Sequence, residues 1–171
     1  MLFARTGEEM SKAFLAIVAL LFASAVTAYS EDDLVGTWRL VSAFKKDVET
    51  GEVSDAYGGP HPVGFLSYGR DHRMMAMAAY DNRVKPARVD QTTPELRDQL
   101  FQTYFAYAGT YSVTGESVQH HIEASWNETW TGTTVTRDVK FDKGRLILTT
   151  RPQLGANGRM VVLTLTWERI K

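Results

Sequence analysis

The regular spacing of turn residues in the second half of the chain constrains the fold more than any other feature. Turn sequences at 114–116, 142–144 and 155–158 separate segments in which apolar and polar residues alternate. Alternating segments separated by turns at intervals of about ten residues indicate an antiparallel meander. Because closure removes exposed edges, we expect an all-β, antiparallel up-and-down barrel of about eight strands. A two-sheet sandwich is the alternative.

The first half of the chain continues this pattern and adds one helix. Alternation predicts further strands over 34–44, 52–57, 63–68 and 73–80. Gly and Pro at 58–62 predict a loop over one mouth of the barrel, since proline cannot donate to a strand ladder. Thr93-Pro94-Glu95 supplies a helix N-cap, a proline at the first helical position and an acid in the first turn. We therefore predict one short helix that ends near Thr103.

The N-terminus has the parts of a secretory signal peptide. A basic residue precedes an apolar run from Ala13 to Ala23, and small residues follow. The run is shorter than the roughly 20 apolar residues that span a bilayer. We expect a signal peptide at 1–28, a mature domain at 29–171, and a secreted or periplasmic protein without a stable membrane anchor after cleavage. Two acids ahead of the run leave open whether translation begins at Met1 or Met10.

Composition excludes several classes of function. The formal net charge of −1 provides no basic surface for nucleic acid. The chain has no cysteine, so disulfides, thiolate zinc sites and cysteine nucleophiles are excluded. It also lacks a Gly-x-Ser-x-Gly elbow and a phosphate-binding loop. We predict no nucleic-acid partner and no cofactor.

Two neighbouring predicted strands, 117–125 and 133–141, carry the residues with the most chemical potential. His120 shares a face with apolar residues of the first strand, and Arg137 does so on the second. If apolar faces point inward, both side chains lie in the lumen, as do Tyr107 and Tyr111 of the preceding strand. A buried Arg needs an anion or several acceptors. This register predicts a pocket for the carboxylate or enolate of an amphipathic ligand.

The opposite register places His121 and Glu123 in the lumen, because one residue of slip exchanges the two faces of a strand. His and Glu at i and i+2 can form a pair that orients the imidazole as a general base or supplies two metal ligands. A metal needs at least a third ligand, and we predict no metal site. Solvent is the commoner environment of such a polar face. In the first register, backbone carbonyls or Glu123 would satisfy Arg137 if no ligand does.

Several motifs resemble those of a family of bacterial and fungal lipocalin-like domain proteins. They are Gly64-Phe65-Leu66-Ser67-Tyr68, Tyr107-Ala108-Gly109-Thr110-Tyr111 and His120-His121-Ile122-Glu123-Ala124-Ser125. Gly36-Thr37-Trp38 and Trp167-Glu168-Arg169 resemble the ends of lipocalins and the wider calycin barrels. The resemblance extends from Leu34 to Lys171 and implies a calycin-type barrel. It also implies that Trp38 packs on Arg169 at the closed end. His72 stands where the family usually has a turn glycine, so the turn at 69–72 is expected to differ.

The leading hypothesis is an exported barrel that binds a small hydrophobic or amphipathic molecule in its lumen. The candidate ligand-binding residues are Tyr68, Met75, Tyr107, Tyr111, His120, His121, Glu123, Trp130 and Arg137. One alternative is an isomerase or cyclase that acts on a hydrophobic substrate with lumenal His and Arg. A second alternative is a filled structural barrel of the cell envelope. The resemblance implies no agreed substrate, so the residues leave open whether the protein is an enzyme.

Overall fold

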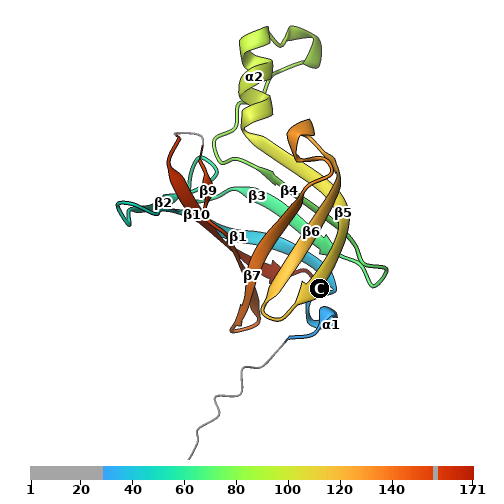
Figure 1. Ribbon diagram of the computed structural model, residues 1–171. Coiled ribbons are helices and arrows are strands. Elements are labelled where there is room, and N and C mark those ends of the chain that lie inside the picture. The colour runs from blue at the N-terminus through green and yellow to red at the C-terminus, as the bar shows by residue number, and fades with distance from the viewer. Residues whose placement is uncertain (1–28, 156–157) are drawn as a thin grey trace, which may run out of the picture.

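The computed structural model describes residues 29–155 and 158–171, and strands dominate it (Figure 1). The strands are β1 (Gly36–Asp47), β2 (Val53–Asp55), β3 (Val63–Tyr68), β4 (Arg73–Ala79), β5 (Tyr104–Thr114), β6 (Ser117–Ser125), β7 (Thr134–Asp142), β8 (Arg145–Thr150), β9 (Gln153–Leu154) and β10 (Met160–Arg169). The helical segments are α1 (Glu31–Leu34), η1 (Val89–Gln91), α2 (Pro94–Gln102) and η2 (Glu128–Trp130).

The strands form a closed antiparallel barrel. Their order is β2-β1-β3-β4-β5-β6-β7-β8-β10-β9, and β1 also pairs with β10, which closes the sheet. The short strands β2 and β9 extend β1 and β10 beyond the barrel of eight. The predicted up-and-down barrel is therefore confirmed, and the sandwich is wrong. Closure makes each strand bury one face against the same lumen.

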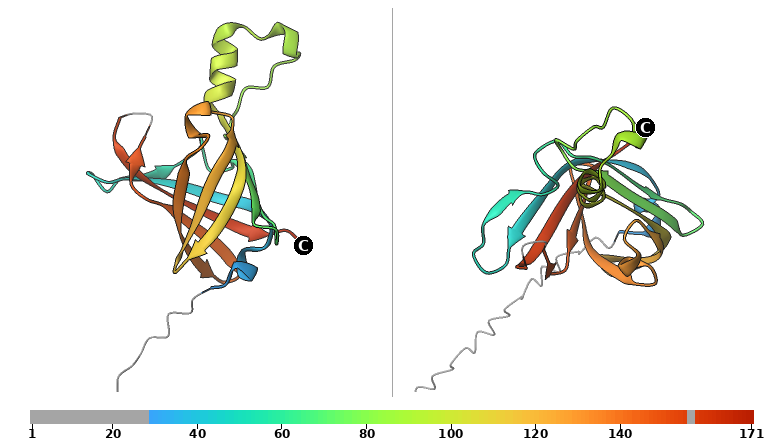
Figure 2. Two further views of the ribbon diagram at one scale, coloured as in Figure 1. Left: turned by 45° about the vertical axis from the view of Figure 1, so that its right-hand side comes forward. Right: turned by 90° about the horizontal axis from the view of Figure 1, so that it is seen from above.

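Helix α2 stands beyond one end of the barrel, which we call the mouth (Figures 1 and 2). The Thr93 side chain accepts a hydrogen bond from the Leu96 amide, and Pro94 occupies the first turn, as predicted. None of the residues of α2 is buried. The Trp126 indole donates to the carbonyl of Phe101 at 3.3 Å. This contact ties the end of the helix to the mouth.

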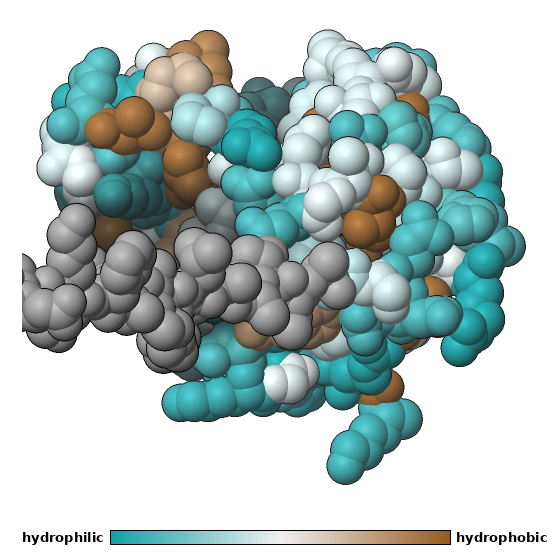
Figure 3. Space-filling view, turned by 60° about the horizontal axis from the view of Figure 1, so that its bottom comes forward, coloured by the Kyte–Doolittle hydropathy of each residue, from teal (hydrophilic) through white to brown (hydrophobic). Residues whose placement is uncertain are grey.

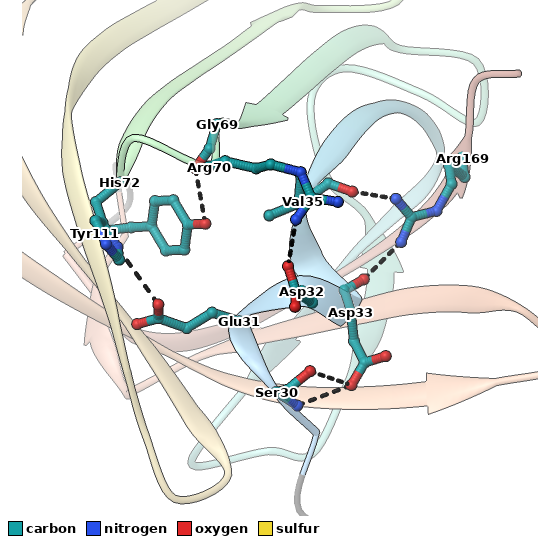
Figure 4. A network of polar contacts seen from close by, with 10 residues as sticks. All are labelled: Ser30, Glu31, Asp32, Asp33, Val35, Gly69, Arg70, His72, Tyr111 and Arg169. Carbon is teal, nitrogen blue, oxygen red and sulfur yellow. Dashed lines mark hydrogen bonds and ion pairs between the residues drawn. The ribbon is translucent and has the colours of Figure 1, made fainter.

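The opposite end is sealed by the segment before β1 (Figure 4). The Arg169 guanidinium lies 4.2 Å from the centre of the Trp38 ring, so the predicted cation–π pair is confirmed. The same guanidinium donates to the carbonyls of Val35 and Asp33, the latter at 2.6 Å. The Trp38 indole donates to the Leu34 carbonyl at 2.8 Å. The Arg169 guanidinium and the Trp38 indole thus both donate to backbone carbonyls, and we call this region the closed end.

Two backbone positions at the closed end explain sequence features noted above. A Cβ at Gly36, where φ is 136°, would lie 2.5 Å from a guanidinium nitrogen of Arg169, so only glycine fits. His72 has a φ of 60°, the left-handed region that glycine favours. The turn therefore keeps the backbone conformation that a glycine would provide. The His72 ring lies 3.4 Å from the carboxylate of Glu31, which links the turn to α1.

The expected start of the first strand is wrong. Residues Glu31–Leu34 form a helical turn, in which the Asp33 carboxylate accepts from the backbone amide of Ser30 at 2.8 Å. This local hydrogen bond competes with extended backbone, so β1 begins at Gly36 instead of Leu34. A register shift between Leu40 and Ser42 then turns Ala43 inward, where strict alternation would bury Ser42.

A second bulge lies where β5 meets β6. Gly109 pairs with Ile122 whereas Ala108 pairs with Ala124, so Glu123 is the extra residue. A Cβ at Gly109 would lie 1.9 Å from the His121 carbonyl oxygen, so the close approach of the strands requires glycine. Because of the bulge, Ala124 is exposed, although alternation places it on the face of His120 and Ile122.

The predicted signal peptide at 1–28 lies outside the described residues. Among residues 29–155 and 158–171, no helix has the length and apolarity to cross a membrane. The side turned forward in Figure 3, which includes the closed end, exposes mainly hydrophilic and neutral residues. Apolar residues appear there in small separate groups.

Candidate functional site

A cavity of about 180 Å³ occupies the lumen between the closed end and the mouth. Its walls are mainly aromatic and aliphatic, with Arg137 as the one charged side chain among the lining residues described. The lining residues are Tyr57, Leu66, Ala76, Tyr80, Gln102, Tyr104, Phe105, Tyr107, His120, Trp126, Trp130, Arg137, Leu148, Thr150, Gln153, Leu163, Leu165 and Trp167. The barrel is therefore hollow, which disfavours the filled structural barrel.

His120 lies in the wall of this cavity, held between two tyrosines. It is 1% exposed, on the inward face of β6 with Val118 and Ile122. The Tyr68 hydroxyl lies 2.6 Å from Nε2 of His120, and the Tyr107 hydroxyl lies 3.0 Å from Nδ1. Both ring nitrogens therefore have partners. The structure selects the register that places His120 inside.

Burial decides the protonation of this cluster. Desolvation, with a further contribution from the charge of Arg137, lowers the pKa of His120 to about 3, so the imidazole is neutral at pH 7. Desolvation raises the pKa of Tyr68 and of Tyr107, and the charge of Arg137 opposes both shifts. The phenols therefore stay protonated. The cluster is a neutral chain of hydrogen bonds beside one cation.

Arg137 supplies that cation from β7. It shares the inward face with Val135 and Val139, as the alternation predicts, and its guanidinium lies beside the Tyr107 phenol. A guanidinium nitrogen donates to the carbonyl of Thr136 at 3.2 Å. Within the described part of the chain, Arg137 forms no ion pair with a carboxylate. A partly buried cation of this kind can attract an anion into the lumen.

Aromatic rings surround the mouth side of the cavity. The Trp130 ring lies 5.9 Å from that of Tyr107 and 4.9 Å from that of Trp126 between ring centres. Phe105 extends the group toward Tyr57, with ring centres 5.3 Å apart. The expectation that Trp130 lines the pocket agrees with this placement. Such a lining suits a flat apolar ligand.

Three other candidate residues lie outside the lumen. Met75 is 62% exposed on the outer face of β4, so its predicted place in the lumen is wrong. Its neighbours Met74 and Ala76 occupy the inward positions. The alternative register with His121 and Glu123 inside is also wrong. His121 contacts the Thr134 hydroxyl on the outer face at 2.8 Å, and Glu123 is exposed and forms an ion pair.

Two tyrosines among the candidates are buried but do not line the cavity. Tyr68 touches the site through His120, so it supports the wall from behind. Tyr111 is buried, but its hydroxyl donates to the Gly69 carbonyl at 3.0 Å, toward the closed end (Figure 4). The structure thus brings together Tyr68, Tyr107, His120, Trp130 and Arg137. Tyr111 packs on Tyr68, with ring centres 4.7 Å apart, but does not line the cavity.

Sequence reasoning missed Trp167 as a lining residue. Trp167 occupies the next inward position along β10 above the Trp38–Arg169 pair. It is 2% exposed, and its indole N–H has no acceptor among the described residues. The apolar alternation of the last strand, with Leu163 and Leu165, was a signal that could have found it. Sequence reasoning linked Trp167 only to the family motif.

A larger depression, of about 640 Å³, lies on the outer face of β3–β6. Met75, Phe65 and Ala108 line it, and no lining residue is Asp, Glu, Lys, Arg or His. Its volume is larger than that of the lumen, but it is more open to solvent. It offers no charged or convergent polar group to orient a ligand. We therefore place the candidate site in the lumen.

The described residues contain no cluster of three or more His, Cys, Asp or Glu side chains that could hold a metal ion. The polar side-chain groups of the described lining are phenol, imidazole, indole and guanidinium groups, the Thr150 hydroxyl and the amides of Gln102 and Gln153.

Comparison with known proteins gives a family and a fold. Residues 35–170 match a family described as a lipocalin-like domain. None of the curated proteins compared matches the chain. A lipocalin-like protein from Bacteroides uniformis is 14% identical, with a TM-score of 0.41, over 81% of this chain and 99% of that one. An uncharacterized protein from Bacteroides eggerthii is 12% identical, with a TM-score of 0.39, over 80% and 99%.

Proposed function

The chain belongs to the family of lipocalin-like domain proteins, and from the hollow of its barrel we propose that it binds a compact, mostly apolar small molecule. The observation that carries this proposal is the cavity of about 180 Å³ enclosed by aromatic and aliphatic side chains. Pockets of this character, with few fixed polar groups, are typical of small-molecule sites. An engineered cavity of about 150 Å³ in another protein accepts benzene, so this one suits a ligand of about one ring.

The ligand reaches the lumen through the mouth. Trp38 and Leu34 seal the other end, where each is almost fully buried. At the mouth, Trp126 and Trp130 lie edge to face beside the cavity. Burial of apolar ligand surface contributes about 25 cal/mol per Å², so contact with these rings favours binding.

Catalysis has less support than binding. Both nitrogens of His120 are engaged by tyrosine hydroxyls, so the imidazole is not free to take a proton from a substrate. An isomerase or cyclase would have to use the Tyr107 phenol, whose pKa burial raises. No observation in the described lumen favours a reaction over binding.

Export is a second part of the proposal, and it rests on the sequence of residues 1–28. We propose cleavage near Ala28 and a secreted or periplasmic mature protein. Sequencing the N-terminus of the protein recovered outside the cytoplasm tests this. A first residue close to Tyr29 supports export, and an intact Met1 or Met10 contradicts it.

The binding proposal is tested by filling the mouth. Leu163 lines the cavity, whereas Val162 lies on the opposite face of β10. Leu163→Trp should abolish the rise in melting temperature that a neutral one-ring probe, benzyl alcohol, causes in the wild type. Val162→Trp is the matched control and should keep that rise. Native mass spectrometry of protein purified without refolding should also show a small co-purifying molecule. Absence of both signals in the wild type would overturn the proposal.

A further inference from the structure

The hydrogen atoms of the lumenal cluster can be assigned from its partners. Tyr68 is fully buried, and the one recorded partner of its hydroxyl is Nε2 of His120. A buried hydroxyl hydrogen needs an acceptor, so Tyr68 donates to Nε2. His120 is neutral, so its single N–H then lies on Nδ1. The imidazole therefore donates to the Tyr107 oxygen.

This direction of donation leaves the Tyr107 hydroxyl hydrogen unused. The phenol oxygen accepts from His120 at 3.0 Å and lies beside the Arg137 guanidinium, which can also donate to it. No acceptor for the Tyr107 hydrogen is recorded within the described chain. Tyr107 is thus a donor toward the cavity that it lines.

Two further side chains that carry donor groups line the same cavity. Arg137 forms no ion pair with a carboxylate in the described chain, and the lining contains no Asp or Glu. The nearby acids Glu123 and Asp138 form ion pairs with Arg73 and Arg151 instead. The buried indole N–H of Trp167 has no acceptor either. The lumen therefore presents the Arg137 cation and the Tyr107 hydroxyl, with the Trp167 indole in its wall.

The donors lie at two depths. Arg137 pairs with Thr150 on β8, and Trp167 pairs with Leu146 on the same strand. Four residues of strand, about 13 Å of backbone, separate these positions. The Arg137 and Tyr107 donors lie together at one level, and the Trp167 donor lies nearer the closed end.

From this arrangement we infer that the lumen binds a compact cyclic carboxylate, with its carboxylate at Arg137 and Tyr107 and its ring against the aromatic wall. This inference rests on the proposed binding function and specifies its ligand class. A carboxylate has only acceptor atoms, so it complements a site made of donors and one cation. The cavity volume limits the hydrocarbon part to about one ring.

The test compares three one-ring probes of nearly equal size by isothermal titration calorimetry at pH 7. They are phenylacetate, neutral phenylacetamide and cationic phenethylamine. Phenylacetate should bind at least about tenfold more tightly than the amide, because a hydrogen bond to a charged group is worth more than a neutral one. Phenethylamine should bind most weakly. Equal affinity for acid and amide would overturn the inference and leave the binding function standing. If no probe binds and no small molecule co-purifies with the protein, both the inference and the proposed binding function fail.

Variants locate the carboxylate. Arg137→Met should remove the preference for phenylacetate over phenylacetamide while the amide still binds, and Tyr107→Phe should reduce the preference partly. Arg151→Met, an exposed arginine close to Asp138 on the outer face, is the matched control and should leave the preference unchanged. If Arg137→Met does not fold, the affinities of the wild type for phenylacetate and phenylacetamide still test the inference. A preference that survives in a folded Arg137→Met variant would overturn the assignment.

The hydrogen assignment has its own readout. Nitrogen-15 NMR of histidine-labelled protein should show His120 as the neutral Nδ1–H tautomer. In Tyr68→Phe, which lacks the hydroxyl that donates to Nε2, His120 should no longer be fixed in that tautomer. An Nε2–H imidazole in the wild type would overturn the chain of donation on which the inference depends.

Discussion

Two arginines of the same barrel, the exposed Arg169 over the closed end and the half-buried Arg137 in the lumen, have opposite surroundings. At the closed end, Arg169 lies on the Trp38 ring and donates to two backbone carbonyls. In the lumen, Arg137 has one recorded carbonyl acceptor, that of its own neighbour Thr136, and no carboxylate within the described residues. Arg169 therefore has its hydrogen-bond acceptors within the protein. Arg137 has no carboxylate partner there.

This difference assigns Arg169 to the stability of the fold and Arg137 to the proposed binding of a ligand. The contacts of Arg169 are with Asp33, Val35 and Trp38, so they tie the start of β1 to the end of β10. Arg137 instead lines a cavity whose walls are mainly aromatic and aliphatic. A group that is left partly unsatisfied lowers stability and is retained when a ligand needs it. We therefore expect substitutions at the two ends to divide into those that unfold the protein and those that change its binding.

The largest expected contrast is between two tryptophans. Trp38→Ala should lower the free energy of unfolding by about 4 kcal/mol, because it leaves a cavity under the sealed end. Trp130→Ala at the mouth should cost about 1 kcal/mol, because the ring is only partly buried. Urea unfolding monitored by far-UV circular dichroism measures both. Equal losses would show that the closed end is not the more rigidly packed region.

The acid limb of the stability curve should be steepened by His120. Its pKa is lowered by burial to about 3 in the folded state, so between its unfolded value near 6.5 and pH 3 the unfolded chain binds more protons. Stability due to neutral His120 is complete above about pH 6.5 and is lost as the pH falls, by about 1.4 kcal/mol per pH unit.

His120→Gln should flatten this slope between pH 6.5 and pH 4.5, where most carboxylates are still ionised. His61→Gln is the control, because His61 is exposed. Urea midpoints at half-unit pH steps provide the measurement. An unchanged slope in His120→Gln would contradict a neutral buried imidazole.

The arginines themselves give the next contrast. Arg169→Gln should destabilise by about 2 kcal/mol through loss of the cation–π contact and the carbonyl hydrogen bonds. Arg137→Met should be neutral or stabilising by up to about 1 kcal/mol, because it removes an uncompensated charge from the lumen. Thermal unfolding of the ligand-free variants measures the pair. A large loss in Arg137→Met would show that Arg137 is structural.

The smallest expected effect is on the outer face of β6. His121→Ala should change stability by no more than about 0.5 kcal/mol, because the side chain is partly exposed and contacts only hydroxyl groups. It should also leave phenylacetate affinity unchanged, since the side chain does not reach the cavity. Reduced affinity in His121→Ala would reopen the alternative register.

Much of the fold could be predicted because its signals are local. Alternation and turns located the barrel strands, and Thr93 with Pro94 located α2. The two bulges could not be predicted, because the residues that change face there, Ser42, Ala43 and Ala124, are too small to mark the shift in the apolar pattern. At Gly109 the need for glycine arises from the carbonyl of a different strand.

The site was predictable only in part. Val118, Ile122, Val135 and Val139 correctly indicated that His120 and Arg137 face inward. Met75 was wrong because a residue type that suits ligand pockets says nothing about which face it occupies. The pairing of His120 with Tyr68 joins residues 52 positions apart, and it depends on closure of the barrel. No sequence spacing encodes it.

The sealed end also has a kinetic consequence. Because Leu34 and Trp38 seal the closed end, a ligand that enters through the mouth also leaves through it. A substitution that only narrows the mouth must therefore slow association and dissociation by the same factor and leave the dissociation constant unchanged. A substitution at Arg137 changes how strongly the bound state holds its ligand, so most of its effect should appear in the dissociation rate. Residence time and affinity can thus vary independently in this barrel.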